Sequence, residues 1–401
     1  MNNRSTPTLE QDRIISLDML RGFALLGIIL ANSLHFQFGL LYDTSITTPY
    51  ANGGIDRLTE SFIFIFVQAS FYPLFSFLFG YGMALQKERL LDKGLNFNAV
   101  FWRRTAILGL VGYLHAMYLW NGDILFTYAW ASVLLFFCLM MPARGLIITG
   151  LILVGLLGSC SLVPDSLYEF GMSDQEMNPT DEFSEKEVVV LSEGSYADVV
   201  EFRQTENPIF PGIFGDIVFI ATQVIGVIGL ILLGAYVMRK GWIKDPITHK
   251  KKWKIIMWVG LGVALLTKSP LTLAPESIQL ATLQSYVGGP FLTAFFVSAF
   301  VLAVTTERGK KILQPLAYAG RMAFTNYLFQ SLIMTTIFYH YGFGLFNSVG
   351  VFAGAMIAVA VFIIQLILSK IWLSYFRMGP LEWIWRAGTY LQLPPLKKKS
   401  K

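Results

Sequence analysis

Four polar side chains within or beside long apolar stretches could carry chemistry: Asn32, His35, His115 and Asp123. An ionisable ring in an apolar segment of membrane length is costly to keep there, so His115 favours a functional role over a packing role. Asp123 follows in the turn Trp-Asn-Gly-Asp, where it could orient that ring or only stabilise the turn. A histidine with a nearby carboxylate is typical of general-base chemistry, in which the ring takes a proton from a hydroxyl or an amine.

Asn32 and His35 follow each other near the far end of the first apolar segment. Asn32 could donate a hydrogen bond to the oxyanion that forms in an acyl-transfer reaction. His35 beside it is the second candidate for the base. The structural alternatives are a hydrogen bond between helices for Asn32 and an interfacial ring for His35.

Two arginines could bind the anionic part of a substrate. Arg21 lies in the first turns of the first apolar segment, shortly after Asp18, and Arg386 lies in GPLEWIWRAGTY near the carboxyl end. Guanidinium groups bind phosphates through charge-assisted hydrogen bonds, so both arginines are predicted to receive the phosphates of coenzyme A. The structural alternative is that Ser16 caps the segment, Arg21 anchors it at the headgroups, and Arg386 pairs with Glu382 one turn earlier.

Three further polar residues, Asp216, Asn326 and Gln330, are candidates for contact with a substrate. Asn326 and Gln330 share one face of a predicted helix, where hydrogen bonds between helices are the commoner use of such residues. The two cysteines, Cys138 and Cys160, lie far apart in apolar segments, and no metal site is predicted.

The elements that must position these residues are helices in a membrane. Hydrophobic residues make up 54% of the 401 residues and charged residues only 14%, which leaves too little polar surface for a soluble globule. Since a helix needs about 20 apolar residues to span a bilayer, the chain is predicted to be an all-α, polytopic membrane protein with about ten transmembrane helices. The predicted spans are 15–38, 60–85, 105–121, 124–141, 145–163, 212–238, 255–268, 279–304, 314–339 and 349–372.

The distribution of positive charge predicts the orientation. Most of the 31 Lys and Arg residues lie at the chain ends and in alternate connections between the spans, which the positive-inside rule assigns to the cytoplasm. Both termini are therefore expected in the cytoplasm, with the protein in the cell membrane. The same bias explains the net positive charge, and no motif for binding nucleic acid accompanies it.

One outer connection divides the predicted helices into two groups. It is rich in Asp and Glu, which is typical of a solvated loop, although a lid that gathers cations or substrate is the alternative. The predicted organisation is an amino-terminal bundle of five helices (1–163), an acidic extracytoplasmic loop (164–211), a second bundle of five helices (212–376), and a cytoplasmic interfacial helix with a basic tail (377–401).

Four stretches of the sequence resemble a known family. They are SLDMLRGFALLGIILAN, LGLVGYLHAMYLWNGDILFTYA, AGRMAFTNYLFQSLI and FRMGPLEWIWRAGTY. They are similar to successive signatures of the YeiB-like membrane proteins, which are defined by a domain of unknown function, and the resemblance extends over nearly the whole chain.

The first stretch also resembles, more weakly, the first helix of heparan-alpha-glucosaminide N-acetyltransferase. That resemblance implies membership of a superfamily that moves an acyl group from cytoplasmic acyl-CoA to an acceptor across the membrane. The asparagine of that helix falls on Asn32 here. The segment after Asn32 departs from the pattern of that enzyme, so the histidine that accompanies the asparagine there has no matching position.

Residues and resemblance together predict an acyltransferase that uses acetyl-CoA or another acyl-CoA and acylates a surface glycan or a small molecule. In this hypothesis His115 is the base, Asp123 fixes its tautomer, and Asn32 binds the oxyanion. The lipid bilayer is the other expected partner, and self-association of the chain is left open.

A proton-coupled transporter of a small solute is the alternative. It would use His115, Asp123 and Asp216 to relay protons and would require no acyl donor.

Overall fold

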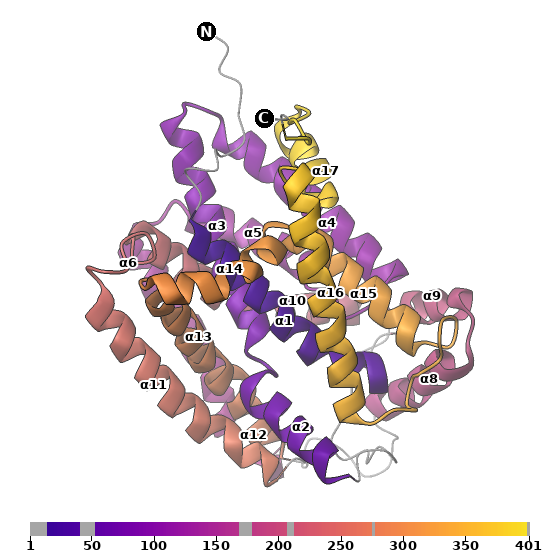
Figure 1. The fold of residues 1–401 in the computed structure, drawn as a ribbon. Helices are drawn as coiled ribbons and strands as arrows, with labels where there is room; N and C mark the ends of the chain where they lie inside the picture. Colours follow the sequence, from indigo (N-terminus) through magenta and orange to yellow (C-terminus); the bar gives the residue numbers. More distant parts are fainter. Residues whose placement is uncertain (1–13, 41–52, 168–178, 207–211, 275–276, 399–401) are drawn as a thin grey trace.

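The protein is built from helices. A computed structural model describes residues 14–40, 53–167, 179–206, 212–274 and 277–398, and the only strand-like pairing among these is one isolated β-bridge between Phe376 and Lys397. The helices (Figure 1) are α1 (Ile15–Phe38), α2 (Gly54–Phe66), α3 (Phe71–Asp92), α4 (Phe97–Tyr118), α5 (Leu125–Cys138), α6 (Ala143–Ser159), α8 (Pro179–Glu193), α9 (Tyr196–Thr205), α10 (Gly212–Arg239), α11 (Lys250–Lys268), α12 (Ile278–Leu283), α13 (Gly289–Ala303), α14 (Glu307–Arg321), α15 (Ala323–Phe338), α16 (Val351–Tyr375) and α17 (Pro380–Tyr390).

Seven stretches of the described chain are long and apolar enough to cross a membrane. They are Ile15–Phe38, Gly54–Asp92, Ala143–Leu162, Ile220–Arg239, Lys250–Thr272, Ile278–Ala303 and Val351–Tyr375. The chain is thus an all-α polytopic membrane protein, as the sequence predicts. The predicted count of about ten also includes α5 and α15, with 14 and 16 residues, and α4, which carries two arginines.

Two of the predicted spans are interrupted by a non-helical break in the structure. The predicted span 60–85 is divided into α2 and α3 at 67–70, where Ala69 adopts a positive φ of 56°. Pro73 lies in the first turn of α3, where its missing N–H costs no hydrogen bond, whereas a continuous helix would need that donor. The predicted span 314–339 is likewise divided between α14 and α15 at Met322.

Helices α1 and α14 cross with their backbones in contact. A Cβ atom at Gly22 would lie 1.9 Å from the carbonyl oxygen of Leu316, and one at Gly320 would lie 1.8 Å from that of Asp18. Only glycine fits at such a crossing. The crossing fixes the first turns of α1, which carry Arg21, against the end of α14.

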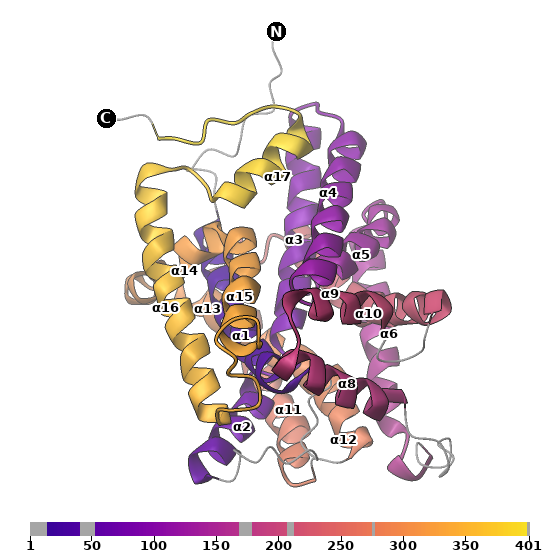
Figure 2. The same ribbon diagram turned by 90° about the vertical axis from the view of Figure 1, so that its right-hand side faces the viewer.

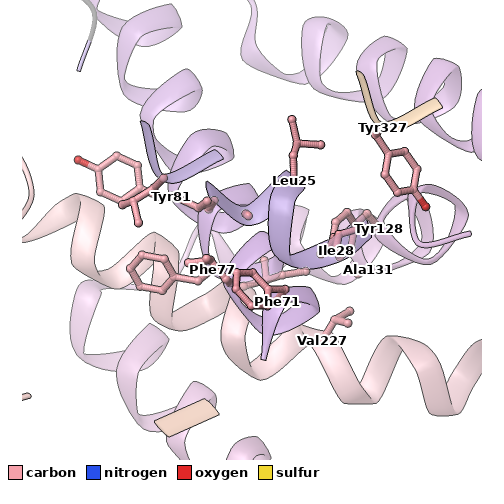
Figure 3. Close-up of a cluster of buried hydrophobic side chains, with 14 of the residues drawn as sticks. Leu25, Ile28, Phe71, Phe77, Tyr81, Tyr128, Ala131, Val227 and Tyr327 are labelled. Atoms are coloured by element: carbon pink, nitrogen blue, oxygen red, sulfur yellow. The ribbon is translucent and has the colours of Figure 1, made fainter. Parts of the chain in front are cut away.

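The buried core joins α1 to the helices around it. Figure 3 shows Leu25 and Ile28 of α1 in one cluster with residues of α3, α5, α10 and α15, among them Phe71, Phe77, Tyr128, Val227 and Tyr327. Each of these seven residues is at most 8% exposed. Because side chains from distant parts of the sequence pack together here, the core holds the two predicted bundles as one unit.

Different helices lie at the two ends of the molecule. In both ribbon views, α17 lies at one end and α2 and α12 lie at the other, whereas α8 lies in the half away from α17 and α9 lies near mid-height (Figures 1 and 2). The described part of the acidic connection, 179–206, is not a solvated loop, because it forms α8 and α9 with Phe183, Leu191, Val199 and Phe202 buried.

Candidate ligand cavity and histidine–aspartate pair

A cavity of about 820 Å³ lies between α1, α3, α4, α5, α15 and α17. This volume is in the range of sites for small molecules and cofactors. The lining residues on α3 run from Phe75 to Leu90, a distance of about 22 Å at the rise of an α-helix. The cavity is therefore deep enough for an elongated ligand.

The end of the cavity beside α17, which we call the mouth, is strongly cationic. Arg21 of α1, Arg104 of α4 and Arg386 of α17 line it, together with the basic residues Arg89, Lys93 and Arg321. The Arg21 Nη1 atom donates a hydrogen bond to Asp18 Oδ1 at 3.1 Å. The guanidinium of Arg104 lies 4.4 Å from the centre of a Trp385 ring, a cation–π contact that holds it in place.

The positive charges at the mouth influence one another. The pKa of Arg386 is lowered, and burial is the largest cause. The charge of Arg21 lowers this pKa further, whereas Tyr390 and Glu382 raise it. Arg104 also interacts electrostatically with Arg21 and Arg386. In the described part of the chain, neither Arg104 nor Arg386 forms an ion pair with an acid. Like charges in a partly buried site repel, so an anionic ligand would stabilise this mouth.

Glu382 does not take the predicted role of partner to Arg386. Its Oε1 atom accepts hydrogen bonds from the backbone N–H groups of Phe324, at 2.8 Å, and Thr325, at 3.1 Å, and its Oε2 atom accepts one from the Thr325 hydroxyl. These groups begin α15, whose first N–H groups have no partner within the helix. Glu382 therefore caps α15 from another element and attaches α17 to the bundle.

The opposite end of the cavity, its floor, is apolar apart from two tyrosines. Ile28, Phe75 and Phe79 line it with Tyr128 and Tyr327. The Tyr128 hydroxyl donates to the Tyr72 carbonyl at 3.2 Å and lies 3.1 Å from the Ser76 hydroxyl. Figure 3 shows Tyr128 beside Ile28 and Tyr327 on the separate helix α15.

His115 and Asp123 form a buried pair. The His115 Nδ1 atom lies 2.8 Å from Asp123 Oδ1, and both side chains are 1% exposed. Asp123 Oδ2 accepts a hydrogen bond from the Phe126 N–H at 2.7 Å. The carboxylate thus contacts the ring and also stabilises the start of α5, so the two predicted uses of Asp123 occur together. A carboxylate at Nδ1 favours the tautomer that carries its proton there, and Nε2 is buried without a hydrogen-bond partner among the described residues.

The pair lies behind the floor of the cavity and does not line it. Ile124, the residue after Asp123, lines the floor, as does Tyr327. The rings of Tyr327 and His115 have centroids 5.4 Å apart, and the Tyr327 hydroxyl is 3.4 Å from the Ile124 N–H and interacts with Asp123. Tyr327 is therefore the side chain between the cavity and the His115 ring.

Comparisons with known proteins place the chain in one family. Residues 237–392 match the family model described as protein of unknown function (DUF418). The chain is 33% identical over 407 residues to the uncharacterized protein YxaH of Bacillus subtilis (strain 168), with 98% of each chain covered. This chain belongs to the YeiB-like DUF418 family.

Two further relatives of this DUF418 protein are similar over their full length. The uncharacterized 39.9 kDa protein in amylase 3'region of Bacillus acidopullulyticus is 31% identical over 98% of this chain and 99% of its own. The uncharacterized protein YeiB of Escherichia coli (strain K12) is 28% identical over 97% of this chain and 99% of its own. The stretch that matches the DUF418 model contains Tyr327 and Arg386, whereas Arg21 and His115 lie outside it.

Asn32 and His35 of the DUF418 protein lie on α1 beyond the cavity. Asn32 is one turn from Ile28, which lines the floor, and one turn from Phe36, whose ring lies 4.4 Å from that of Trp120. His35 lies against the main chain that follows α1, and its Nδ1 atom has no hydrogen-bond partner among the described residues. No contact recorded for the described chain joins either residue to His115.

The other predicted residues are separate from the cavity. The side-chain nitrogen of Asn326 donates to the Ser369 hydroxyl at 3.0 Å, and that of Gln330 donates to the side chain of Gln365 at 2.9 Å. These are hydrogen bonds between α15 and α16, the structural alternative for such residues. Asp216 belongs to α10, but its side chain is outside the described part of the structure.

The sequence alone does not indicate Arg104 or Tyr327 as residues of the cavity, or Glu382 as the cap of α15. Arg104 lies within a helix, as Arg21 does, but the positive-inside rule by itself accounts for a positive charge at this position. Tyr327 directly follows Asn326, and a tyrosine inside a membrane helix carries no signal that distinguishes a cavity wall from a core position. The capping role of Glu382 depends on a contact with a segment 58 residues earlier in the chain.

Proposed function

We propose that this DUF418 protein transfers an acyl group from a cytoplasmic acyl-CoA, such as acetyl-CoA, to an acceptor on the outer side of the membrane. The observation that carries the proposal is the convergence of Arg21, Arg104 and Arg386 at the mouth of a deep cavity whose floor adjoins the His115–Asp123 pair. A surface glycan or a small molecule with a hydroxyl or an amine is the acceptor class that suits this chemistry.

The cavity suits an elongated anionic donor. The arginines of the mouth would bind its phosphates through charge-assisted hydrogen bonds. Gln86 and Tyr390, which contact each other at 3.1 Å and line the same end, offer further polar groups. The apolar floor would receive the acyl end, and the donor supplies an activated thioester there.

His115 would act on the acceptor. Its Nε2 atom takes the proton of the acceptor hydroxyl or amine while the acceptor oxygen or nitrogen bonds to the acyl carbon. The carbon–sulfur bond breaks, and the proton passes from Nε2 to the departing sulfur. Asp123 stabilises the charged ring between these steps. Tyr327 must turn aside for the ring to meet the acyl group, and Asn32 is the proposed donor to the oxyanion.

Binding of the donor is the first experiment. The thermal unfolding of the purified protein is measured with and without millimolar acetyl-CoA, since a ligand that binds only the folded state raises its stability. Losing one charged hydrogen-bond donor costs about 1.5–3 kcal/mol, which weakens binding roughly 10- to 150-fold. We therefore expect Arg104→Ala to abolish most of the stabilisation.

Arg103→Ala is the matched control, because Arg103 is the neighbour of Arg104 on α4 and does not line the cavity. It should leave the stabilisation by acetyl-CoA unchanged. Wild-type protein that gains no stability at millimolar acetyl-CoA would contradict the proposed donor.

Transport is the second candidate function, and one observation favours it. Lys268, at the end of α11, is fully buried, and its Nζ atom donates to the Gln68 carbonyl at 2.7 Å in the break between α2 and α3. A broken helix beside an ionisable group inside the membrane is typical of transporters. Proton-driven solute uptake into vesicles that is lost in Lys268→Met, without any effect of acetyl-CoA, would favour transport over acyl transfer.

A further inference from the structure

The hairpin of α8 and α9 lies against the ends of three core helices that are away from α17 (Figure 2). Hydrogen bonds join it to each of these helices. They are Leu40 N–H to Glu187 Oε2 at 2.8 Å after α1, the Tyr196 hydroxyl to the Tyr118 carbonyl at 2.7 Å on α4, and His340 N–H to the Leu191 carbonyl at 3.0 Å after α15. The hairpin is thus attached to the bundle at three separate points.

The residues beneath the hairpin lie next to the histidine–aspartate pair in the chain. Tyr118, which accepts the bond from α9, ends the same helix that carries His115, less than one turn away. Trp120, two residues further on, is 2% exposed, and its ring packs against that of Phe36 of α1 at a tilted angle. The hairpin therefore closes the side of His115 that is opposite the cationic mouth.

Glu187 is the buried acid in this contact. It is 4% exposed, whereas Glu185 and Lys186 beside it on α8 are exposed. The side chain of Asn121, in the turn after α4, also hydrogen-bonds to its carboxylate. The charged and titratable groups that face it are Arg203 of α9 and Tyr339 after α15. From α1 it meets the Leu40 main chain, against which His35 also lies.

We propose that the α8–α9 hairpin is a pH-sensitive lid over the outer approach to His115, held closed by Glu187. The lid opens as Glu187 ionises, because the carboxylate gains hydration when the hairpin leaves the bundle. The proposal rests on the proposed function only in assigning His115 as the group that the lid protects.

The direction of the pH effect follows from the burial of Glu187. Burial raises its pKa from 4.5 to about 7, against the lowering effects of the hydrogen bonds from Leu40 and Asn121 and of the charge of Arg203. The neutral form therefore favours the closed lid. The stabilisation is complete below pH 4.5 and is lost as the pH rises through about 7. For an open lid with an ordinary glutamate, linkage gives about a tenfold rise in the opening equilibrium between about pH 6 and pH 8.

Cysteine accessibility tests the lid without any assay of activity. Val199 of α9 is 1% exposed and packs in the main core, so Val199→Cys should react with a soluble thiol reagent only when the lid opens. The protein is otherwise freed of cysteine by Cys138→Ala and Cys160→Ala and is held in lipid nanodiscs that expose both faces. We compare its labelling rate at low and high pH with that of the same protein carrying Glu187→Gln, because the ratio at each pH removes the reactivity of the thiol itself.

We expect labelling in the Glu187 protein to rise about tenfold more, between about pH 6 and pH 8, than in the Glu187→Gln protein. Glu185→Gln, on the exposed face of the same helix, should behave as the parent does. Equal pH dependence in the Glu187 and Glu187→Gln proteins would overturn the proposal, as would fast labelling of Val199→Cys at every pH.

Backbone hydrogen exchange of α8 and α9 in the unaltered protein gives a second measurement that needs no substitution. After correction for the intrinsic exchange rate, opening should increase with pH over the same range, and a flat profile would refute the lid. Neither measurement involves acyl-CoA, so a failure of donor binding and a failure of the lid are distinguishable.

Discussion

Removing the cap that Glu382 provides should destabilise the protein and loosen the cavity mouth together. In Glu382→Ala, the N–H groups of Phe324 and Thr325 lose their acceptor, and the Thr325 hydroxyl loses its own. The same change removes the tie between α17, which carries Arg386, and α15, which carries Tyr327. One side chain therefore supports both ends of the proposed site.

The expected magnitude follows from the groups left without partners. Loss of a helix cap costs about 0.5–2 kcal/mol, and a buried donor left unsatisfied costs about 1–3 kcal/mol. Because Glu382 and Phe324 line the cavity, water can reach the freed N–H groups, and the sum stays near the lower values. We expect Glu382→Ala to lower the free energy of unfolding by about 2–3 kcal/mol. Glu382→Gln keeps one acceptor oxygen and should cost about 1 kcal/mol, because a neutral hydrogen bond is weaker than a charged one.

Thermal unfolding of the purified protein measures this difference. Glu307→Ala is the matched control, since Glu307 is an exposed glutamate whose main contact is a surface ion pair with Lys310, and such a change should stay within about 0.5 kcal/mol. Binding of acetyl-CoA should weaken in Glu382→Ala and remain in Glu307→Ala. If Glu382→Ala unfolds at the same temperature as the control, the capping contact does not attach α17 to the bundle, and the reasoning is refuted.

Three further predictions concern orientation, chemistry and packing. A cysteine at Ser184 should react with an impermeant reagent from outside the cell and one at Lys251 should not, because of the bias in positive charge; labelling of Ser184→Cys only from inside would reverse the direction of transfer. His115→Ala should reduce acyl transfer roughly 10²- to 10⁴-fold while sparing donor binding, and Asp123→Asn should act less strongly; unchanged transfer in a folded His115→Ala protein would make the ring a packing residue. Gly320→Ala should lower the free energy of unfolding by about 1–3 kcal/mol, measured by thermal unfolding, because its Cβ atom would overlap a backbone carbonyl of α1. An unchanged stability would show that α1 and α14 can separate easily.

The sequence predicts the helices well and their breaks poorly, for a physical reason. An apolar run of membrane length is a local signal, and each long run indeed forms helix. The breaks depend on distant groups. At the break at 67–70, the Gln68 carbonyl accepts a hydrogen bond from Lys268, which lies two hundred residues later in the chain. The start of α15 is capped by Glu382. Neither partner can be inferred from the residues at the break itself.

The candidate site divides in the same way. His115 and Asp123 are close in the chain, so their contact could be predicted from spacing and turn chemistry. Arg21, in the first turns of the first span, and Arg386, in the interfacial helix, are both predicted to receive the phosphates of coenzyme A, and the structure brings both to one cavity. The third arginine, Arg104, was missed because charge near a helix end is usually explained by orientation alone.

The arginines of the mouth also bear on the charge of the proposed ligand. Three separate helices bring Arg21, Arg104 and Arg386 to one cavity, and the acid nearest to Arg386 in sequence, Glu382, is used to cap α15. A surface anchor would let each guanidinium reach water or lipid phosphate by itself, without the cost of placing like charges together. Their convergence at one end of a cavity that extends about 22 Å along α3 instead favours a ligand that has several negative charges at one end and an apolar group at the other. An acyl-CoA has this distribution of charge, and a small neutral solute does not.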